Sequence, residues 1–369
     1  MILLSSIIDT FEAELLEHYQ DSLSPSHRQA LAAMKQCRTT HSPAMLAECE
    51  GCARQVYVPH SCGHRNCPHC QQHESQQWLE RQLQKQVPAE YFLVTFTLPK
   101  ELRPLAWQQQ RTLYSLMTRC SWETLKTFTQ NDPQLKGNAG AITVLHTHSR
   151  RLDYHPHVHC VIPAAAIDTA QRLWRTKAGQ GKDKRKSGYL FNHKALAKVF
   201  RTKLLEAIRA EGLALPDRYP ETWVVDVKSV GSGDKALIYL GRYLYKGVIQ
   251  EKDIMACRDG QVTFRFQDSK TRQMRTRTLP GSQFLWLILR HVLPKGFRRA
   301  RNFGFLHPNS KRLIGLLQYL LGFNPNQALA WLRKRPPLTC SCCGGDMRIV
   351  KTRIPPFLRG LTMPAEQSC

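Results

Sequence analysis

The spacing of apolar residues changes along the chain and predicts an alternation of strands and helices. Runs rich in aromatic and β-branched residues that end at Pro or Gly predict strands. Such runs occur at Tyr91–Leu98, Ala141–His148, His157–Ile162 and Thr222–Val227. Apolar residues three and four apart predict helices. This spacing occurs at Glu74–Gln86, Leu102–Phe128, Asn192–Ala210, and between the turn Gly231-Ser232-Gly233 and Gly247.

These elements predict an α+β fold. The link between the second and third strands, Ser149–Pro156, is too short for the crossover that a parallel pair requires. We therefore expect an antiparallel sheet flanked by helices rather than a doubly wound parallel sheet. The strand that contains His157 is expected near the centre of this sheet, with the helix that ends before Gly247 packed near it.

Beyond residue 260 the pattern predicts an edge hairpin and then a separate helical region. The hairpin strands are expected at Gln261–Gln267 and Met274–Leu279, and the helices at Ser282–Leu293, Pro308–Leu321 and Asn326–Leu332. We expect three domains. They are N-terminal helices with a Cys-rich segment (1–88), an α+β domain (89–280) and a basic helical region with a Cys-rich tail (281–369).

The charge of the chain indicates a polyanionic partner. Lys and Arg number 53 against 28 Asp and Glu, which gives a formal net charge of +25 and a pI near 9.8. Between Ser269 and Gly345 there is no acidic residue, and aromatic residues are interleaved with the basic ones. This pattern favours contact with nucleic acid over a solvated basic face or an anionic membrane surface. No export signal, membrane span or nucleotide-binding loop is recognisable, so we expect a cytosolic protein with reduced cysteines.

Six cysteines between residues 37 and 70 predict structural zinc. A CxxC pair presents two thiolates to one ion, and two pairs complete a tetrahedral site. We expect this site to consist of Cys49, Cys52, Cys67 and Cys70. A candidate second set consists of Cys37, His41, Cys62 and His64, with His69 as an alternative to His64. Metal binding would supply folding energy to a segment with few large apolar residues.

A further CxxC pair, Cys340 and Cys343, lies near the other end of the chain. It resembles half of a zinc ribbon without its partner. Cys257 and Cys369 are the remaining candidates to complete it.

Two short motifs carry the candidate catalytic chemistry. Side chains alternate along a strand, so His157 and His159 are expected to point to one face and to hold a divalent ion, with His155 as a candidate third member. Residues four apart on a helix share a face, so Tyr239 and Tyr243 are expected to present two phenols together. A divalent ion beside a tyrosine is suited to covalent attack on a phosphodiester.

Each motif alone has a simpler interpretation. Polar residues on a half-buried strand, or a structural metal site, would explain the histidines. His146 and His148 have the same spacing and are taken as incidental. Tyrosines on an amphipathic helix usually pack in a core. The third metal ligand stays open between Asp226 and Asp153 or an amide side chain.

Taken together, these motifs resemble the rolling-circle transposases of the HUH type, specifically the two-tyrosine insertion-sequence-91 family. The resemblance runs almost end to end. It includes the opening Cys37-Arg38-Thr39, the segment Ser61–Cys70, His146-Thr147, Trp223–Val227, the two motifs, and His291–Phe297. One departure is Asn66, where such proteins often carry a histidine before the cysteine.

The resemblance implies an HUH endonuclease core that nicks and rejoins single-stranded DNA at transposon ends and in the target. It implies that His157 and His159 hold Mg²⁺ or Mn²⁺, and that a tyrosine attacks the phosphorus to leave a 5′-phosphotyrosine and a free 3′-OH. Lys246 or Lys235 is expected to assist electrostatically, while Tyr245 is expected to be structural. Further DNA contacts are expected from Arg242, Lys295, Arg298, Arg299 and Arg301. A bacterial, nucleoid-associated protein that needs no ATP is implied.

Three alternatives remain. A replication initiator or conjugative relaxase would share the chemistry but usually lacks the zinc module. A non-catalytic zinc-dependent DNA-binding regulator would explain the charge and the cysteines but not the two motifs. A hydrolase that activates water would need a carboxylate cluster beside the histidines.

Overall fold

The computed structural model describes residues 2–39, 41–70, 72–177, 190–245, 247–268, 271–330 and 337–356. The chain forms two compact units whose segments interleave along the sequence. The first unit comprises Met1–Glu74, Tyr245–Val292 and Leu332–Cys369, and the second comprises Ser75–Leu244 and Leu293–Trp331. The three consecutive domains expected from the sequence therefore differ from these two interleaved units.

The second unit is built on a five-stranded antiparallel sheet with the histidine strand at its centre. The strand order is β12-β4-β5-β3-β8, and every neighbouring pair is antiparallel. The strands are β3 (Tyr91–Thr97), β4 (Gly140–His148), β5 (Tyr154–Pro163), β8 (Val225–Ser229) and β12 (Ala300–Gly304). The predicted α+β class and the central position of the histidine strand are confirmed.

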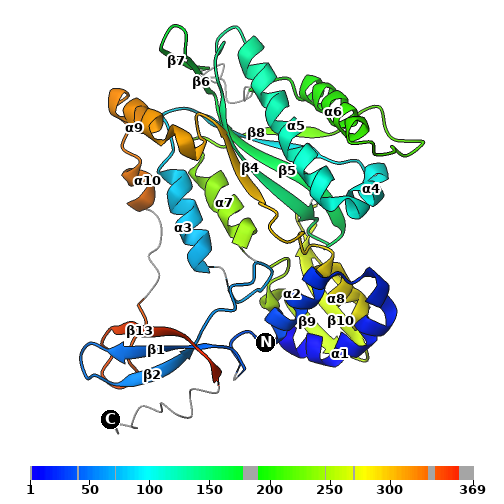
Figure 1. Cartoon of the computed structure of the whole chain (residues 1–369), viewed down its shortest axis with the longest axis vertical. Helices are drawn as coiled ribbons and strands as arrows, with labels where there is room; N and C mark the ends of the chain where they lie inside the picture. Colours follow the sequence, from blue (N-terminus) through cyan, green and yellow to red (C-terminus); the bar gives the residue numbers. More distant parts are fainter. Residues whose placement is uncertain are drawn as a thin grey trace. The chain divides into compact units, whose positions relative to one another are not determined.

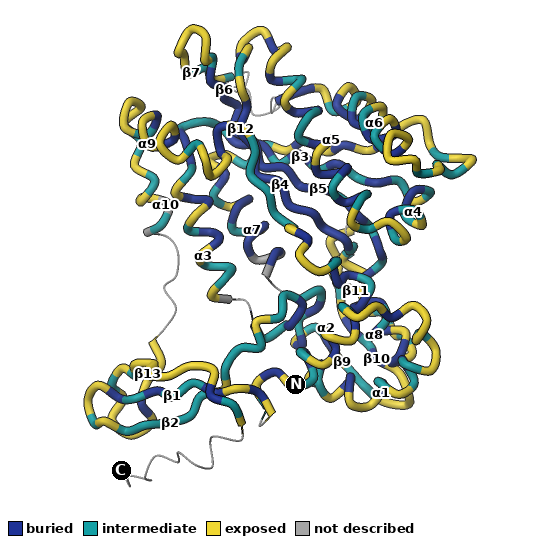
Figure 2. The backbone as a smooth tube through the Cα atoms, viewed as in Figure 1, coloured by how far each residue is buried: buried dark blue, intermediate teal, exposed yellow. Residues whose placement is uncertain are grey.

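Helices cover both faces of this sheet, and its strands β4 and β5 are buried (Figures 1 and 2). On one face lie α4 (Arg103–Gln108), α5 (Gln110–Asn131) and α6 (His193–Ala210), which enclose the apolar core with Phe96 and Phe200. On the other face lie α3 (Gln72–Leu83) and α7 (Asp234–Tyr245). The remaining elements of this unit are β6 (Ala165–Asp168), β7 (Leu173–Thr176), α9 (Lys311–Leu320) and α10 (Asn326–Ala330), with 3-10 turns η2 (Lys100–Leu102) and η4 (Pro308–Ser310).

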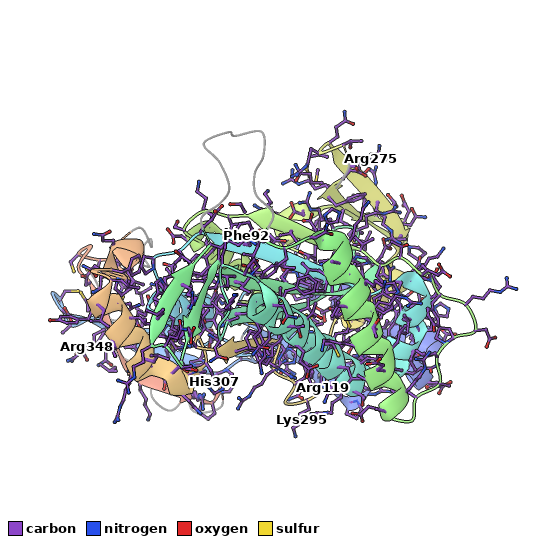
Figure 3. All side chains as sticks on the ribbon, turned by 90° about the horizontal axis from the view of Figure 1, so that it is seen from above. Phe92, Arg119, Arg275, Lys295, His307 and Arg348 are labelled. Carbon is purple, nitrogen blue, oxygen red and sulfur yellow. The ribbon has the colours of Figure 1, made fainter. Side chains whose placement is uncertain are left out.

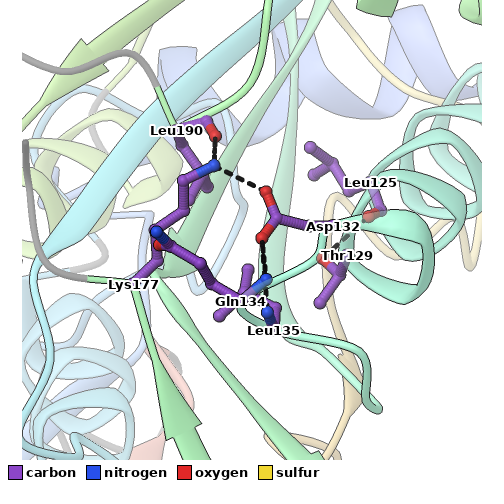
Figure 4. Close-up of polar contacts among 7 residues, drawn as sticks. All are labelled: Leu125, Thr129, Asp132, Gln134, Leu135, Lys177 and Leu190. Carbon is purple, nitrogen blue, oxygen red and sulfur yellow. Dashed lines mark hydrogen bonds and ion pairs between the residues drawn. The ribbon is translucent and has the colours of Figure 1, made fainter.

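An ion pair joins the end of α5 to the residues on either side of segment 178–189. Lys177 Nζ donates to Asp132 Oδ2 at 2.5 Å and to the Leu190 carbonyl oxygen at 3.0 Å (Figure 4). The other carboxylate oxygen of Asp132 accepts from the amides of Gln134 and Leu135. Lys177 is thereby held to both Asp132 and Leu190.

The first unit contains two small sheets. One has the order β13-β1-β2 and joins β1 (Ala44–Cys49) and β2 (Gln55–Pro59) to β13 (Met347–Ile354), from opposite ends of the chain. The other has the order β11-β10-β9, with β9 (Ile254–Arg258), β10 (Gln261–Gln267) and β11 (Met274–Pro280). The predicted hairpin is present, but it belongs to this sheet rather than to the edge of the five-stranded sheet.

The N-terminal helices pack on the segment that follows the tyrosine helix. The N-terminal elements are α1 (Leu4–Tyr19), the 3-10 turn η1 (Gln20–Ser22) and α2 (Pro25–Gln36). They pack against α8 (Gly281–Leu289) and the 3-10 turn η3 (Glu251–Asp253). Trp286 stacks on Tyr19 with ring centroids 4.9 Å apart. The buried carboxylate of Glu251 accepts from the Leu4 amide at 2.7 Å and lies 3.0 Å from His69 Nε2. Within the described ranges, no helix combines the length and the apolar character needed to cross a bilayer.

A glycine closes the contact between β12 and β4. Gly304 has φ +58°, and a Cβ there would lie 1.8 Å from the Ala139 carbonyl oxygen.

We expect Gly304→Ala to lower the free energy of unfolding by roughly 2–4 kcal/mol, because backbone strain adds to overpacking. Urea unfolding measures the change. Gly315→Ala in α9 is the matched control, since nothing lies within 4 Å of its Cβ. An exposed helical Gly→Ala change should stabilise by about 0.5–1 kcal/mol. Equal effects of the two substitutions would contradict this account of β12.

Candidate functional site

Three histidines from two neighbouring strands converge on one face of the central sheet. His157 and His159 on β5 share that face, and His146 on β4 lies directly opposite His157 in the register. The ring centroids lie 4.3 Å (His146–His159), 4.9 Å (His157–His159) and 5.1 Å (His146–His157) apart. One nitrogen from each ring lies within 4.8 Å of the other two. This arrangement can hold one metal ion.

Hydrogen bonds fix the orientation of the two β5 rings. Thr95 Oγ1 on β3 lies 2.8 Å from His159 Nδ1. His157 Nδ1 lies 2.7 Å from the His155 carbonyl oxygen, an acceptor, so Nδ1 carries the proton. In both rings the Nδ1 contact leaves Nε2 as the atom that faces a metal, which is how ligating histidines are usually held.

Burial keeps these imidazoles neutral. His146 and His159 are 1% and 9% exposed. Burial lowers the pKa of His157 to about 4 and holds the pKa of both His146 and His159 well below the ordinary value for histidine. Neighbouring histidines add to the effect at His146 and His159. A neutral imidazole is the form that binds metal.

Tyr239 lies beside the histidines. Its ring centroid is 6.2 Å from that of His159 and 6.4 Å from that of His146. Its side chain is 48% exposed and is therefore accessible from solvent. Partial burial raises the pKa of the phenol, and Arg150 nearby opposes this. The phenol is therefore protonated at neutral pH.

The position of α7 depends on two close approaches. Gly233, with φ +87°, turns the chain from β8 into α7 against the Tyr91 ring, where a Cβ would lie 2.7 Å from the ring. Gly241 packs on Trp78 of α3, and Ser75 Oγ donates to the Gly241 carbonyl oxygen at 3.0 Å. At the other end, Arg299 Nη1 donates to the Leu244 carbonyl oxygen, where a positive charge favours the helix dipole.

The structure separates the predicted catalytic residues into those near the histidines and those elsewhere. His155 is not part of the histidine group, because its Nδ1 lies 2.6 Å from Arg103 Nη2. Asp226 is exposed on β8 opposite Thr95 and is not in the group either. Tyr243 lies one turn after Tyr239 on α7, but its side chain and that of Arg242 fall outside the described residues, as does all of Lys246.

The predicted DNA-contacting residues also divide. Lys295 and Arg298 are exposed, and Lys295 projects from the surface like Arg275 and Arg348 (Figure 3). Arg299 is half-buried and caps α7, and Arg301 lies over the Phe297 ring and donates to Ser115 Oγ. These last two side chains are thus engaged within the fold.

The cysteines form two groups, and the predicted grouping is corrected. Cys67 and Cys70 lie with Cys37 and Cys62, while Cys49 and Cys52 lie with Cys340 and Cys343. His41 and His64 belong to neither group. Cys257 lies on β9, and Cys369 falls outside the described residues. The sequence-based grouping followed proximity along the chain, whereas the fold brings the two ends together.

Sequence reasoning missed His146. The available signal was the antiparallel pairing of two predicted strands, each with histidines at alternate positions. Spacing alone does not give the register, so it could not show that His146 faces His157 while His148 faces Tyr154.

Comparisons with known proteins assign the chain to the transposases. A family model described as "Putative transposase" matches residues 140–313, and one described as "Transposase zinc-binding domain" matches residues 7–98. The chain is 30% identical over 308 residues to "Putative transposase y4qJ" of Sinorhizobium fredii, covering 77% of this chain and 75% of that protein. It is 29% identical over 283 residues to the transposase for insertion sequence element IS801 of Pseudomonas savastanoi pv. phaseolicola. That match covers 73% of this chain and 66% of that transposase. The chain belongs to the IS91-type transposase family.

Among solved structures, the conjugative relaxase TrwC in complex with oriT DNA aligns with 63% of this chain and 72% of its own. The sequence identity is 14% and the TM-score is 0.26. A metal-bound form of that complex aligns with a TM-score of 0.25.

The third histidine can be tested by metal binding. We expect His146→Ala to weaken Mn²⁺ binding by about tenfold or more, as His157→Ala should, because each removes one ligand of the same ion. Isothermal titration measures the affinity, and circular dichroism checks the fold. His148→Ala is the control and should leave the affinity within about twofold. Wild-type affinity in His146→Ala would exclude this residue from the site.

Proposed function

We propose that this transposase nicks and rejoins single-stranded DNA through a covalent phosphotyrosine, with Tyr239 as a nucleophile. The observation that supports this proposal is the position of an accessible tyrosine beside three neutral histidines, two of which are buried. A purely structural metal site would not need the exposed phenol of Tyr239 beside it. A tyrosine that only packs in the core would not be 48% exposed.

The donor set fits a divalent ion. Three imidazoles favour a first-row transition ion such as Mn²⁺ over Mg²⁺, which prefers oxygen ligands. Such an ion, when bound by His146, His157 and His159, would polarise the scissile phosphate and stabilise the charge that develops on it.

The protein residues carry out the remaining steps. The Tyr239 oxygen forms a bond to phosphorus and loses its proton, while the bond from phosphorus to the 3′ oxygen breaks. The products are a 5′-phosphotyrosine and a free 3′-OH. Rejoining reverses these steps, when a 3′-OH attacks the phosphotyrosine and the phenol is released. The phosphodiester energy is retained in the ester, so no nucleotide cofactor is required. Tyr243, one turn along α7, is proposed as the second nucleophile.

The proposed substrate is single-stranded DNA at the ends of an insertion sequence and in its target. The segment that carries Lys295 and Arg298 leads into β12, and the Arg299 carbonyl oxygen accepts from the Leu145 amide beside His146. Exposed positive charge therefore lies next to the strand that carries the histidines. A replication initiator or relaxase would use the same chemistry, whereas a zinc-dependent regulator would use neither motif.

The covalent step can be detected directly. Wild-type protein incubated with labelled single-stranded end DNA and Mn²⁺ should give a protein–DNA adduct that resists denaturation and is absent with EDTA. We expect the adduct to be lost in Tyr239→Phe/Tyr243→Phe, and the two single variants to rank the two tyrosines. Tyr319→Phe, which alters an 83% exposed tyrosine on α9, should behave as wild type. Tight DNA binding without any adduct would instead favour a binding protein.

The basic surface can be tested by the salt dependence of binding. We expect Lys295→Ala/Arg298→Ala to weaken single-stranded DNA binding and to reduce the slope of log K against log salt by about 1.4, because two phosphate contacts are lost. Fluorescence anisotropy at several salt concentrations measures the slope. Arg209→Ala, which alters an exposed arginine in the last turn of α6, is the control. An unchanged slope in the double variant would exclude this surface.

A further inference from the structure

Four thiols from the two ends of the chain meet in the first unit. Cys49 Sγ lies 3.4 Å from Cys343 Sγ, 294 residues later, and Cys52 Sγ lies 3.7 Å from Cys340 Sγ, 288 residues later. All four sulfurs lie within 4.8 Å of one another. These distances exceed the ~2.05 Å of a disulfide. They are close to the spacing of about 3.8 Å between sulfurs around a tetrahedral zinc with Zn–S bonds of ~2.3 Å.

The two contributing turns have the same backbone geometry. In the first, the Ala53 amide donates to the Cys49 carbonyl oxygen at 3.1 Å, and the Cys49 amide donates to the Arg54 carbonyl oxygen at 2.9 Å. In the second, the Gly344 amide donates to the Cys340 carbonyl oxygen at 3.0 Å, and the Cys340 amide donates to the Gly345 carbonyl oxygen at 2.8 Å. Each turn is thus one complete zinc knuckle.

The residue after the second cysteine of each knuckle has a left-handed backbone. Gly344 has φ +74°, and Ala53 has φ +55°. The left-handed region is unfavourable for alanine, and the strain persists only where the surroundings require that conformation. The knuckle geometry is therefore imposed at Ala53 rather than adopted by default.

Backbone amides point at the sulfurs. The amides of Gly51 and Cys52 lie 3.4 and 3.5 Å from Cys49 Sγ, and the amide of Cys342 lies 3.4 Å from Cys340 Sγ. Such donors stabilise negative charge on sulfur, which is the state that binds metal. A Cβ at Gly345 would lie 3.3 Å from Cys343 Sγ, so the backbone approaches the group closely.

Strand pairing holds the knuckles in place. β13 follows the C-terminal knuckle and pairs with β1, which ends in the N-terminal knuckle, with Cys49 opposite Met347. The Glu50 amide donates to the Asp346 carbonyl oxygen at 3.0 Å. The two knuckles thus face each other across one small sheet.

We propose that Cys49, Cys52, Cys340 and Cys343 bind one structural Zn²⁺ and form a zinc ribbon made from both ends of the chain. The matched zinc-binding domain, residues 7–98, contains only half of this ligand set, and neither family model reaches Cys340. The site is separate from the group Cys37, Cys62, Cys67 and Cys70. Its zinc fastens β13, with the exposed basic residues Arg348, Lys351 and Arg353, to the N-terminal module.

The proposal is tested by counting the zinc ions that are bound to thiolates in the purified full chain. An organomercurial releases these ions, because it reacts with thiols and not with imidazoles. We expect two zinc ions from the wild-type chain. Each of the two double variants, Cys340→Ser/Cys343→Ser and Cys49→Ser/Cys52→Ser, should release one zinc ion. The quadruple variant should also release one zinc ion, because both pairs belong to the same site. Cys342→Ser alters an exposed cysteine of the same turn outside the group and should still release two.

Two zinc ions from Cys340→Ser/Cys343→Ser would overturn the proposal, as would a quadruple variant that releases none. Cys343→His guards against misfolding of the serine variants, since it keeps four ligands. Loaded with Co²⁺, it should show weaker thiolate-to-cobalt absorption than wild type at an equal metal content. Unchanged absorption would show that Cys343 is not a ligand.

Discussion

The register between β4 and β5 is the constraint on which the candidate active site depends. Side chains alternate along a strand, so a shift of one residue would move His146 to the opposite face. In the observed register His146 faces His157, and Val144 faces His159. The same pairing continues through β3, where Thr95 lies opposite His159 and bonds its ring. One set of backbone hydrogen bonds thus assembles the ligands and orients one of them.

The tyrosine is positioned by a different kind of contact. A helix can approach a neighbour closely only where its side chains are small, and Gly241 provides that point against Trp78. Arg299 then joins the end of α7 to the strand edge beside β4. Of the basic residues expected to contact DNA, Arg299 therefore has a structural role in the fold, and it adds positive charge near His146.

Much of the second unit could be predicted from local pattern. Apolar runs bounded by Pro or Gly gave β3, β4 and β5, and the short link at Ser149–Pro156 gave their antiparallel pairing. The strand Ala300–Gly304 was missed because it is short, and its polar and basic residues do not alternate with apolar ones. His146 and the cysteine grouping were missed for one reason. Spacing reports which residues share a face of one element, and it does not report which elements meet.

The pairing of β1 with β13 also sets an order of events during synthesis. About 300 residues separate the two strands, and a ribosome that adds ~5–20 residues per second needs roughly 15–60 s to make them. Throughout that interval the edge of β1 lacks its neighbour, while the complete set of histidine strands has time to emerge and fold. A chain that ends before β13 would have a complete five-stranded sheet and an unpaired edge on β1. Among the described residues, the strand that leaves the ribosome last is thus the one that completes the sheet begun first.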